Sequence, residues 1–239
     1  MEKKSRFDEE LENLGITLTD RQKDQFDRYY EMLVEWNSVM NLTGITDYDE
    51  VNLKHFTDSL TIVRNVDMDS ISSLIDIGTG AGFPGMPVKI AFPHIKVVLL
   101  DSLNKRIKFL NAVIEELELE NVKTLHGRAE DYAKKEEYRE KFDICTSRAV
   151  ANLSTLSEYC IPFIKTGGRF VSYKSAESGE EIEESKKAIE ILGGKIVKTD
   201  KFLLANTDIR RALVVIRKER NTPKKYPRKA GVPAKEPLK

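Results

Sequence analysis

The stretch Leu74-Ile75-Asp76-Ile77-Gly78-Thr79-Gly80-Ala81-Gly82-Phe83-Pro84-Gly85 decides the fold of this chain. A short apolar run ends in a carboxylate, three alternating glycines follow, and a proline stands where a helix would begin. An open α/β sheet builds a nucleotide pocket in this way, at the carboxyl end of its first strand. Glycine allows positive φ angles and lets a ligand approach the backbone closely. The stretch therefore predicts a nucleoside-binding turn.

The acidic residue before the turn, Asp76, separates two classes of ligand. A dinucleotide would bring an anionic pyrophosphate to the helix N-terminus, and a carboxylate beside it would be repulsive, because unit charges about 4 Å apart interact by about 4 kcal/mol at intermediate dielectric. S-adenosylmethionine has no phosphate and carries an ammonium and a sulfonium group. The pattern therefore favours a methyltransferase over a nicotinamide-dependent oxidoreductase. Gly80, Gly82 and Gly85 also satisfy G-x-G-x-x-G, so the dinucleotide alternative stays open at this point.

Beyond the turn, strand patterns alternate with helix patterns, which is typical of a parallel doubly wound sheet. The predicted strands are 73–77, 95–101, 122–126, 142–147 and 169–174, and the predicted helices lie near 84–92, 104–118, 130–137, 152–161 and 177–192. Two further strand patterns, 195–204 and 211–217, flank Asn206-Thr207-Asp208 and predict a hairpin. The fold class is therefore α/β, with the Rossmann-like sheet of a class I methyltransferase and a terminal antiparallel hairpin.

The first 65 residues predict an N-terminal helical extension that caps the sheet. Thr19 and Gln22 form a capping box at the start of one helix, and Asp47 begins a second helix that runs to Ile62. We therefore divide the chain into a helical cap (1–65), an S-adenosylmethionine-binding domain (66–217) and a C-terminal tail (218–239).

Composition excludes several classes of protein. Of the 239 residues, 40% are hydrophobic and 33% are charged, as expected of a globular protein with a highly charged surface. We see neither a secretory signal nor an apolar run approaching the ~20 residues of a membrane span. Cys145 and Cys160 form no C-x-x-C pair and are expected to be buried reduced thiols. We expect a monomeric, cytoplasmic protein. We expect neither a membrane partner nor a metal site.

The net charge is zero, but the charges are unevenly distributed. From Arg217 to Lys239 there are nine Lys or Arg and two Glu, a local charge of +7, and the same segment holds four prolines. Such a segment cannot bury a core of its own, so we expect it to be extended or disordered when alone. Basic arms of this kind commonly contact nucleic acid phosphates, although a solubilising terminus is the alternative.

Other strand ends supply further candidate site residues. Asp101 lies nineteen residues after Gly82, close to the ~20 expected of a carboxylate that accepts ribose hydroxyls. The loop after the third strand borders the adenine side, where Ala129 and the amides around Glu130 could meet the adenine edge. Arg148, at the end of the fourth strand, could hold the methionine carboxylate or an RNA phosphate. We expect an anionic substrate to be contacted by the cations that lie near the strand ends: Lys105, Arg106 and Lys174.

Absent motifs narrow the chemistry. There is no Asn/Asp-Pro-Pro-aromatic motif for an exocyclic adenine amine, no Pro-Cys loop for 5-methylcytosine, and no zinc-ligand spacing. His55, His94 and His126 are scattered along the sequence. The absences fit an acceptor that needs no deprotonation, such as N7 of guanine, whose lone pair can attack the sulfonium methyl directly. We therefore expect in-line transfer with no catalytic general base.

The motifs together identify a family. The chain closely resembles the bacterial 16S rRNA guanine-N7 methyltransferases, the ribosomal small subunit methyltransferase G family, also called glucose-inhibited division protein B. The resemblance covers nearly the whole chain and rests on Asp76 to Gly85, His126-Gly127-Arg128-Ala129-Glu130, Ser147-Arg148-Ala149-Val150, Trp36-Asn37, Asn41-Leu42-Thr43, His55-Phe56-x-Asp58-Ser59 and Asn221-Thr222-Pro223-Lys224-Lys225-Tyr226-Pro227-Arg228-Lys229.

The resemblance implies methylation of N7 of guanine 527 in the 530 loop of 16S rRNA, with S-adenosylmethionine as cofactor. It implies that the cofactor is contacted by Gly78, Phe83, Ala129, Glu130 and Arg148. With the 16S rRNA or the small subunit as partner, the basic tail becomes a candidate for phosphate contacts through Lys224, Lys225, Arg228 and Lys229. Three alternatives remain at this point: a small-molecule methyltransferase, an oxidoreductase linked to NAD, and a non-enzymatic RNA-binding assembly factor.

Overall fold

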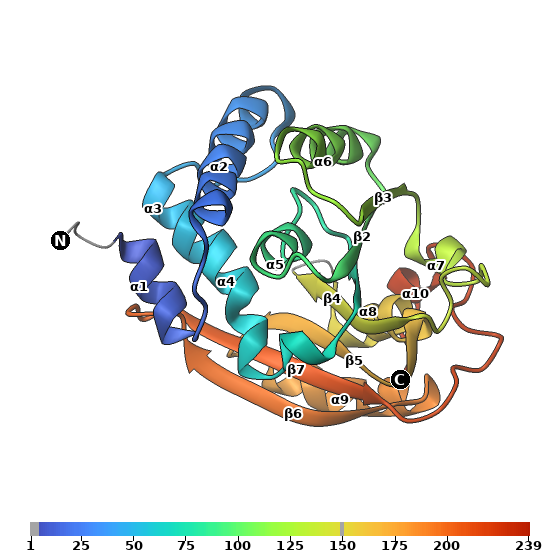
Figure 1. Ribbon diagram of the computed structural model, residues 1–239. Helices are drawn as coiled ribbons and strands as arrows, with labels where there is room; N and C mark the ends of the chain where they lie inside the picture. Colours follow the sequence, from blue (N-terminus) through green and yellow to red (C-terminus); the bar gives the residue numbers. More distant parts are fainter. Residues whose placement is uncertain (1–4, 149–150) are drawn as a thin grey trace.

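A seven-stranded sheet forms the centre of the protein (Figure 1). The computed structural model describes residues 5–148 and 151–239, so Ala149 and Val150 of the sequence motif lie outside the described part. The strands are β1 (Ser73–Ile77), β2 (Lys96–Asp101), β3 (Val122–His126), β4 (Phe142–Arg148), β5 (Ile164–Ser175), β6 (Gly194–Leu203) and β7 (Arg210–Lys218), in the order β3-β2-β1-β4-β5-β7-β6. Strands β1 to β5 are parallel, and β7 runs antiparallel to both β5 and β6. The predicted Rossmann-like sheet with its terminal hairpin is confirmed.

Strand β1 lies between β2 and β4, where the order of the strands reverses. Its apolar residues serve both faces, since Leu74 joins one hydrophobic cluster while Ile75 and Ile77 join the other. A parallel strand that is buried on both faces has a continuous run of apolar residues. This is why the strand could be predicted from the sequence. In sheets of this kind, ligands bind outside the carboxyl ends of the strands at the reversal.

Helices cover both faces of the sheet (Figure 1). On one side lie α5 (Gly85–Ala91), α6 (Asn104–Glu116) and the N-terminal cap, and on the other lie α8 (Leu153–Cys160) and α9 (Gly179–Ile191). The short helix α7 (Ala129–Tyr132) follows β3 and ends earlier than the predicted 130–137. The connecting turns include η3 (Met68–Ser70) and η4 (Ile161–Phe163).

The cap begins with α1 (Arg6–Asn13) and α2 (Asp20–Met40). The predicted capping box is present at α2: the Thr19 hydroxyl accepts from the Gln22 amide at 3.3 Å, and the Thr19 amide donates to the Gln22 side chain at 2.8 Å. The second predicted helix does begin after Asp47 but is broken into α3 (Tyr48–Val51), the π-helical η1 (Asn52–Thr57), α4 (Asp58–Leu60) and the 3₁₀ turn η2 (Thr61–Arg64). π-helical turns often occur at functional sites, and this one ends next to Asp58.

The cap and the sheet share one hydrophobic cluster. The ring centroid of Phe56 lies 5.1 Å from that of Phe26 and 5.3 Å from that of Tyr29. The Tyr29 ring centroid is also 5.6 Å from that of Phe83 in the glycine turn. The Tyr29 hydroxyl donates a hydrogen bond to the Ala81 carbonyl. The cap is therefore packed directly onto the nucleoside-binding turn.

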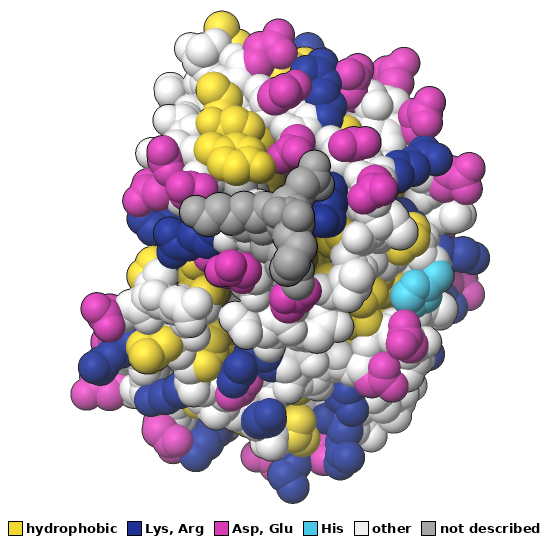
Figure 2. All heavy atoms as spheres, turned by 60° about the vertical axis from the view of Figure 1, so that its left-hand side comes forward, with side chains coloured by type: hydrophobic (Ala, Val, Ile, Leu, Met, Phe, Trp, Pro, Cys, Tyr) yellow, Lys and Arg dark blue, Asp and Glu magenta, His cyan; other side chains and the backbone are white. Residues whose placement is uncertain are grey.

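The outer face of the cap shows no single-sign charge. In Figure 2, which brings the left-hand side of Figure 1 forward, Lys and Arg side chains are interspersed with Asp and Glu, and apolar side chains lie among them. Acidic partners of the cap's cations include Asp8, Glu116 and Glu118. Among the described residues visible on this face, charges of both signs are therefore mixed.

The C-terminal tail packs against the domain and contains the short helix α10 (Val232–Lys235). The sequence prediction concerned the tail when alone, and this packing does not test it. Tyr226 is buried in the cluster that contains α8 residues, and Thr222 is buried as well. The composition of the tail indicated correctly that it has no hydrophobic core of its own. It did not reveal that Tyr226 of the tail packs into the hydrophobic cluster of the domain.

Candidate functional site

The glycine turn after β1 is held from beneath by Asp76. Its carboxylate accepts from the Thr79 hydroxyl at 2.6 Å, the Gly85 amide at 3.0 Å and the Thr146 hydroxyl at 3.0 Å. The side chain is fully buried, and burial raises the pKa of Asp76 to about 6 despite these donors. The sequence argument set this charge beside the ligand, whereas the structure encloses it under the turn. Direct contact between Asp76 and a ligand therefore stays a prediction.

Three glycines give the turn its shape. Gly78, Gly80 and Gly82 have φ values of +68°, +64° and +106°, in the region that side chains disfavour. A Cβ on Gly80 would face open space, with the Gly78 carbonyl oxygen 4.0 Å away. A Cβ on Gly82 would instead lie 2.5 Å from the Tyr29 hydroxyl. Gly80 therefore leaves room on the ligand side, and Gly82 leaves room for the cap.

Asp101 ends β2 and supports the same turn. One carboxylate oxygen accepts from the Gly80 amide at 2.9 Å and pairs with Arg106 at 3.2 Å, and the other accepts from the Leu103 amide at 2.9 Å. A carboxylate offers about four acceptor positions, so one remains for a ligand hydroxyl. The nineteen-residue spacing thus does bring Asp101 to the turn. Arg106 is thus held beside the glycine turn through Asp101, and its expected contact with RNA stays a prediction.

A hollow of about 360 Å³ lies above the turn. The turn contributes one wall, the end of β2 with Asp101 a second, and the cap a third. Five of the nine predicted cofactor residues line it: Gly78, Gly80, Phe83, Asp101 and Arg148. The other four lie behind its walls. Asp76 and Gly82 are in the support of the turn, and Ala129 and Glu130 are buried in the first turn of α7.

His55 stacks on Phe83 at the rim of this hollow. The ring centroids are 4.6 Å apart and the planes are inclined by 21°. Its Nε2 lies 2.8 Å from the Thr43 hydroxyl, while its Nδ1 lies 3.4 Å from an Arg148 nitrogen. Burial, with the nearby Arg148 charge, lowers the pKa of His55 to about 4. The imidazole is thus neutral at pH 7 and is held by its neighbours in one orientation.

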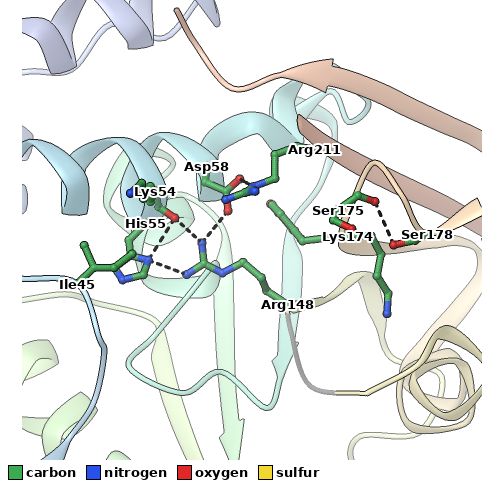
Figure 3. A pocket seen from close by; sticks show the side chains of 10 residues that line it. Ile45, Lys54, His55, Asp58, Arg148, Lys174, Ser175, Ser178 and Arg211 are labelled. Atoms are coloured by element: carbon green, nitrogen blue, oxygen red, sulfur yellow. Dashed lines mark hydrogen bonds and ion pairs between the residues drawn. The ribbon is translucent and has the colours of Figure 1, made fainter. Parts of the chain in front are cut away.

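A second hollow, of about 520 Å³, opens next to the first (Figure 3). Both hollows are lined by His55 and Arg148. At the centre of the second, Asp58 pairs with Arg148 at 2.9 Å and, through its other oxygen, with Arg211 at 2.8 Å. The Asp58 side chain is 4% exposed, compared with 15% and 28% for the two arginines. The two guanidinium groups therefore form the open side of this cluster, with the carboxylate behind them.

Arg148 also reaches the backbone of the cap. Its Nη1 donates to the Lys54 carbonyl at 3.2 Å, within the π-helical turn. Its guanidinium carbon lies 5.0 Å from the Phe83 ring centroid. One side chain at the end of β4 thus contacts the cap, the glycine turn and the second hollow. Its predicted place at the sheet edge is confirmed by the strand register, and its ligand stays a prediction.

Sequence reasoning missed Asp58 and Arg211 and assigned no site role to His55. Asp58 and His55 come from the cap and Arg211 from the terminal hairpin, 153 residues after Asp58. The only local signal was the run His55-Phe56-x-Asp58-Ser59, which entered the family resemblance without a role. Their meeting depends on long-range packing that no spacing rule describes.

The predicted RNA-contacting cations are not all free. Lys105 donates to the Met40 carbonyl at 2.7 Å, and Lys174 to Glu181 at 2.6 Å and to the Ala151 carbonyl at 2.8 Å. Arg228 is paired with Glu158 inside the molecule. Of the four tail residues predicted to contact RNA, three are exposed: Lys224, Lys225 and Lys229.

The described residues offer neither a metal site nor a membrane-spanning helix. Across residues 5–148 and 151–239, no group of three or more His, Cys, Asp or Glu is placed to hold a metal ion. Within the same residues, no helix combines the length and the hydrophobicity needed to cross a bilayer. Cys145 and Cys160 are both buried and free, as expected.

Known proteins resemble the chain in sequence and in fold. The family model of rRNA small subunit methyltransferase G (GidB) matches residues 22–212. A ribosomal RNA small subunit methyltransferase G from Lachnoclostridium phytofermentans is 52% identical over 238 residues, which cover 100% of this chain and 98% of that protein. Among solved structures, the complex between the Haloferax volcanii Trm112 methyltransferase activator and a putative methyltransferase matches with a TM-score of 0.58, 13% identity and coverage of 79% and 98%. P. horikoshii TYW2 in complex with MeSAdo matches with a TM-score of 0.50, 14% identity and coverage of 64% and 60%.

Proposed function

This chain belongs to the rRNA small subunit methyltransferase G family, and on that premise we propose that it transfers a methyl group from S-adenosylmethionine to N7 of guanine 527 in the 530 loop of 16S rRNA. The observation that carries the proposal is the meeting of two hollows at His55 and Arg148. One hollow has the features of a nucleoside site and the other is lined by cations, so a methyl donor and an RNA base can meet between them.

The first hollow suits S-adenosylmethionine. Gly80 leaves open space where a side chain would stand, so an adenosine can approach the backbone. Asp101 retains one acceptor position for a ribose hydroxyl, because three of about four are used. Phe83 offers a ring at the rim, and α7 begins next to Asp101, because the Gly127 amide donates to the Asp101 carbonyl at 3.0 Å. The MeSAdo-bound TYW2 neighbour supports an adenosine-type ligand for this fold.

The second hollow suits a nucleotide of RNA. Its lining includes Lys54, Arg148, Lys174 and Arg211, and its main acid, Asp58, is covered by two of them. Guanidinium groups bind phosphate in a planar fork, and specific RNA recognition commonly takes bases splayed out of loops. The exposed tail residues Lys224, Lys225 and Lys229 are proposed to contact phosphates further from the reacting base.

The residues of the site fit a reaction without a general base. S-adenosylmethionine supplies an activated methyl group when bound. The attacking N7 carries no proton, so the protein has to align nucleophile, methyl carbon and sulfur, and effective molarities for such alignment reach about 10⁵–10⁸ M. His55 is neutral at pH 7 and is occupied by Thr43 and Arg148. We infer that His55 and Arg148 position the two substrates and that neither takes a proton from the base.

The test is direct mapping of the modified nucleotide. The protein is incubated with methyl-labelled S-adenosylmethionine and with naked 16S rRNA, an assembly intermediate or small subunits that lack the modification. We expect label at N7 of guanine 527 in at least one of these substrates. Gly78→Val is the control: its positive φ strains a β-branched residue, and we expect loss of cofactor binding with an unchanged circular dichroism spectrum.

Other outcomes would replace the proposal. Label at another nucleotide would leave an rRNA methyltransferase with a different target. Label in small molecules alone would indicate a small-molecule methyltransferase. Binding to the small subunit without methyl transfer to any particle would indicate a non-enzymatic assembly factor.

A further inference from the structure

The C-terminal segment 219–239, here called the strap, has its first anchor in the side chain of Arg139. The Arg139 guanidinium donates to the strap carbonyls of Thr222 at 2.8 Å and Tyr226 at 2.9 Å. The same group donates to the carbonyl of Ala133, directly after α7, at 3.2 Å. The guanidinium group of Arg139 therefore binds both the strap and the end of α7.

A second anchor is the ion pair between Arg228 and Glu158. The guanidinium donates to both oxygens of Glu158, from Nε to Oε1 at 3.0 Å and from Nη2 to Oε2 at 2.7 Å. The Arg228 amide also donates to Glu158 Oε1, at 2.7 Å. The Glu158 side chain is fully buried on α8. A bidentate pair of this kind fixes direction as well as distance, so the strap cannot slide along α8 without breaking it.

The strap then reaches α7 itself. The Gly231 amide donates to a Glu130 carboxylate oxygen at 2.9 Å, and Glu130 is 2% exposed. Glu130 stands in the first turn of α7, immediately after the turn that follows β3. That turn is joined to the cofactor hollow, since the Gly127 amide donates to the Asp101 carbonyl. One chain of contacts thus runs from Gly231 to Asp101.

We propose that the strap is a brace for the adenine side of the cofactor site, with Glu130 as its positioning residue. The Glu130 carboxylate accepts from the Gly231 amide and so ties the first turn of α7, which follows the Gly127–Asp101 contact beside the cofactor hollow, to the strap. The inference rests on the proposed function, because it assumes an adenosine in the adjoining hollow. It also separates two roles in a basic tail: inward contacts serve the cofactor, and exposed lysines serve RNA.

Three variants of the full chain test this division. Glu130→Ala removes the acceptor for Gly231, Glu130→Gln keeps an acceptor oxygen of the same reach, and Lys225→Glu reverses an exposed tail charge. Binding of S-adenosylhomocysteine is measured by calorimetry, with the thermal midpoint measured beside it. We expect about tenfold weaker binding for Glu130→Ala, in line with a lost hydrogen bond to a charged group. We expect Glu130→Gln to stay within about threefold of wild type and Lys225→Glu to match it.

Steady-state kinetics distinguish a positioning role from a general loss of stability, because they give separate KM values for S-adenosylmethionine and for the rRNA substrate. In Glu130→Ala the KM for S-adenosylmethionine is expected to rise while the KM for the rRNA substrate stays unchanged, and Lys225→Glu should show the reverse. Glu130→Ala that binds S-adenosylhomocysteine like wild type, or Glu130→Gln that binds as weakly as Glu130→Ala, would overturn the brace. Wild-type protein that binds no S-adenosylhomocysteine would instead overturn the proposed function itself.

Discussion

The titration of His55 makes the free energy of unfolding depend on pH, and the contribution of this one residue can be measured separately. Its pKa is about 4 in the folded protein and about 6.5 in an unfolded chain. The folded state therefore resists protonation, and the stability that His55 contributes above pH 6.5 is lost as the pH falls toward 4. From pH 7 to pH 5 the two values correspond to a loss of about 2 kcal/mol in the free energy of unfolding.

Asp76 acts in the opposite direction over the same range. Its pKa is about 6 in the folded protein and 3.8 in the reference state. A raised carboxyl pKa contributes stability that is present below pH 3.8 and is lost as the pH rises through 6, so lowering the pH from 7 to 5 returns about 1 kcal/mol. The contributions of His55 and Asp76 to the free energy of unfolding partly cancel in wild type. The pH profile of wild type alone therefore does not reveal either contribution.

A comparison of His55→Gln with wild type removes the cancellation. Urea unfolding at intervals from pH 4.5 to pH 7.5 gives the free energy of unfolding of each protein. We expect the difference between the two to change by about 2 kcal/mol between pH 7 and pH 5, with the variant relatively more stable at the acid end. Thr43→Val is the matched control, because it removes the partner of Nε2 but keeps the buried imidazole. Parallel curves for wild type and His55→Gln would refute the burial argument for this residue.

Three further substitutions test other parts of the structure. Gly82→Ala should lower the free energy of unfolding by about 1–3 kcal/mol in urea titration, because its Cβ would lie 2.5 Å from the Tyr29 hydroxyl at a φ of +106°; an unchanged midpoint would contradict the close packing of cap and turn. Arg228→Ala should cost about 3–5 kcal/mol by the same measurement, since it leaves the Glu158 carboxylate buried without its cation; Lys225→Ala is its surface control. Asp101→Ala should weaken S-adenosylhomocysteine binding at least about tenfold in calorimetry, because the turn and a ribose hydroxyl both lose an acceptor; wild-type affinity would remove Asp101 from the site.

The sheet could be predicted from sequence because its signals are local. The apolar run of β1, the glycines after it and the spacing to Asp101 each lie within a few tens of residues. All seven predicted strands are present, with ends that differ by up to five residues, the largest shift being at β5, which starts at Ile164 rather than 169. Buried parallel strands and glycine turns leave patterns that survive without knowledge of the tertiary structure.

The second hollow could not be predicted in the same way. Asp58 begins α4, directly after a π-helical turn that helical periodicity does not describe. Arg211 lies near the start of a strand whose pattern indicated only a hairpin. The pairing of Arg228 could not be predicted for a related reason: composition records Arg228 as a cation but not that a buried Glu158 faces it. Pairings between distant charges depend on which elements pack together.

The geometry around Arg148 gives the cap a role beyond covering the sheet. Asp58 and the Lys54 carbonyl, both from the cap, fix the guanidinium, and Phe83 of the glycine turn lies beneath it at 5.0 Å. The cap therefore sets the position of Arg148, a cation that lines both hollows. Because an in-line transfer depends on the alignment of two bound molecules, a shift of the cap relative to β4 would misplace both substrates together. On this reasoning the cap belongs to the catalytic unit, and the sheet alone would hold a cofactor without presenting an acceptor to it.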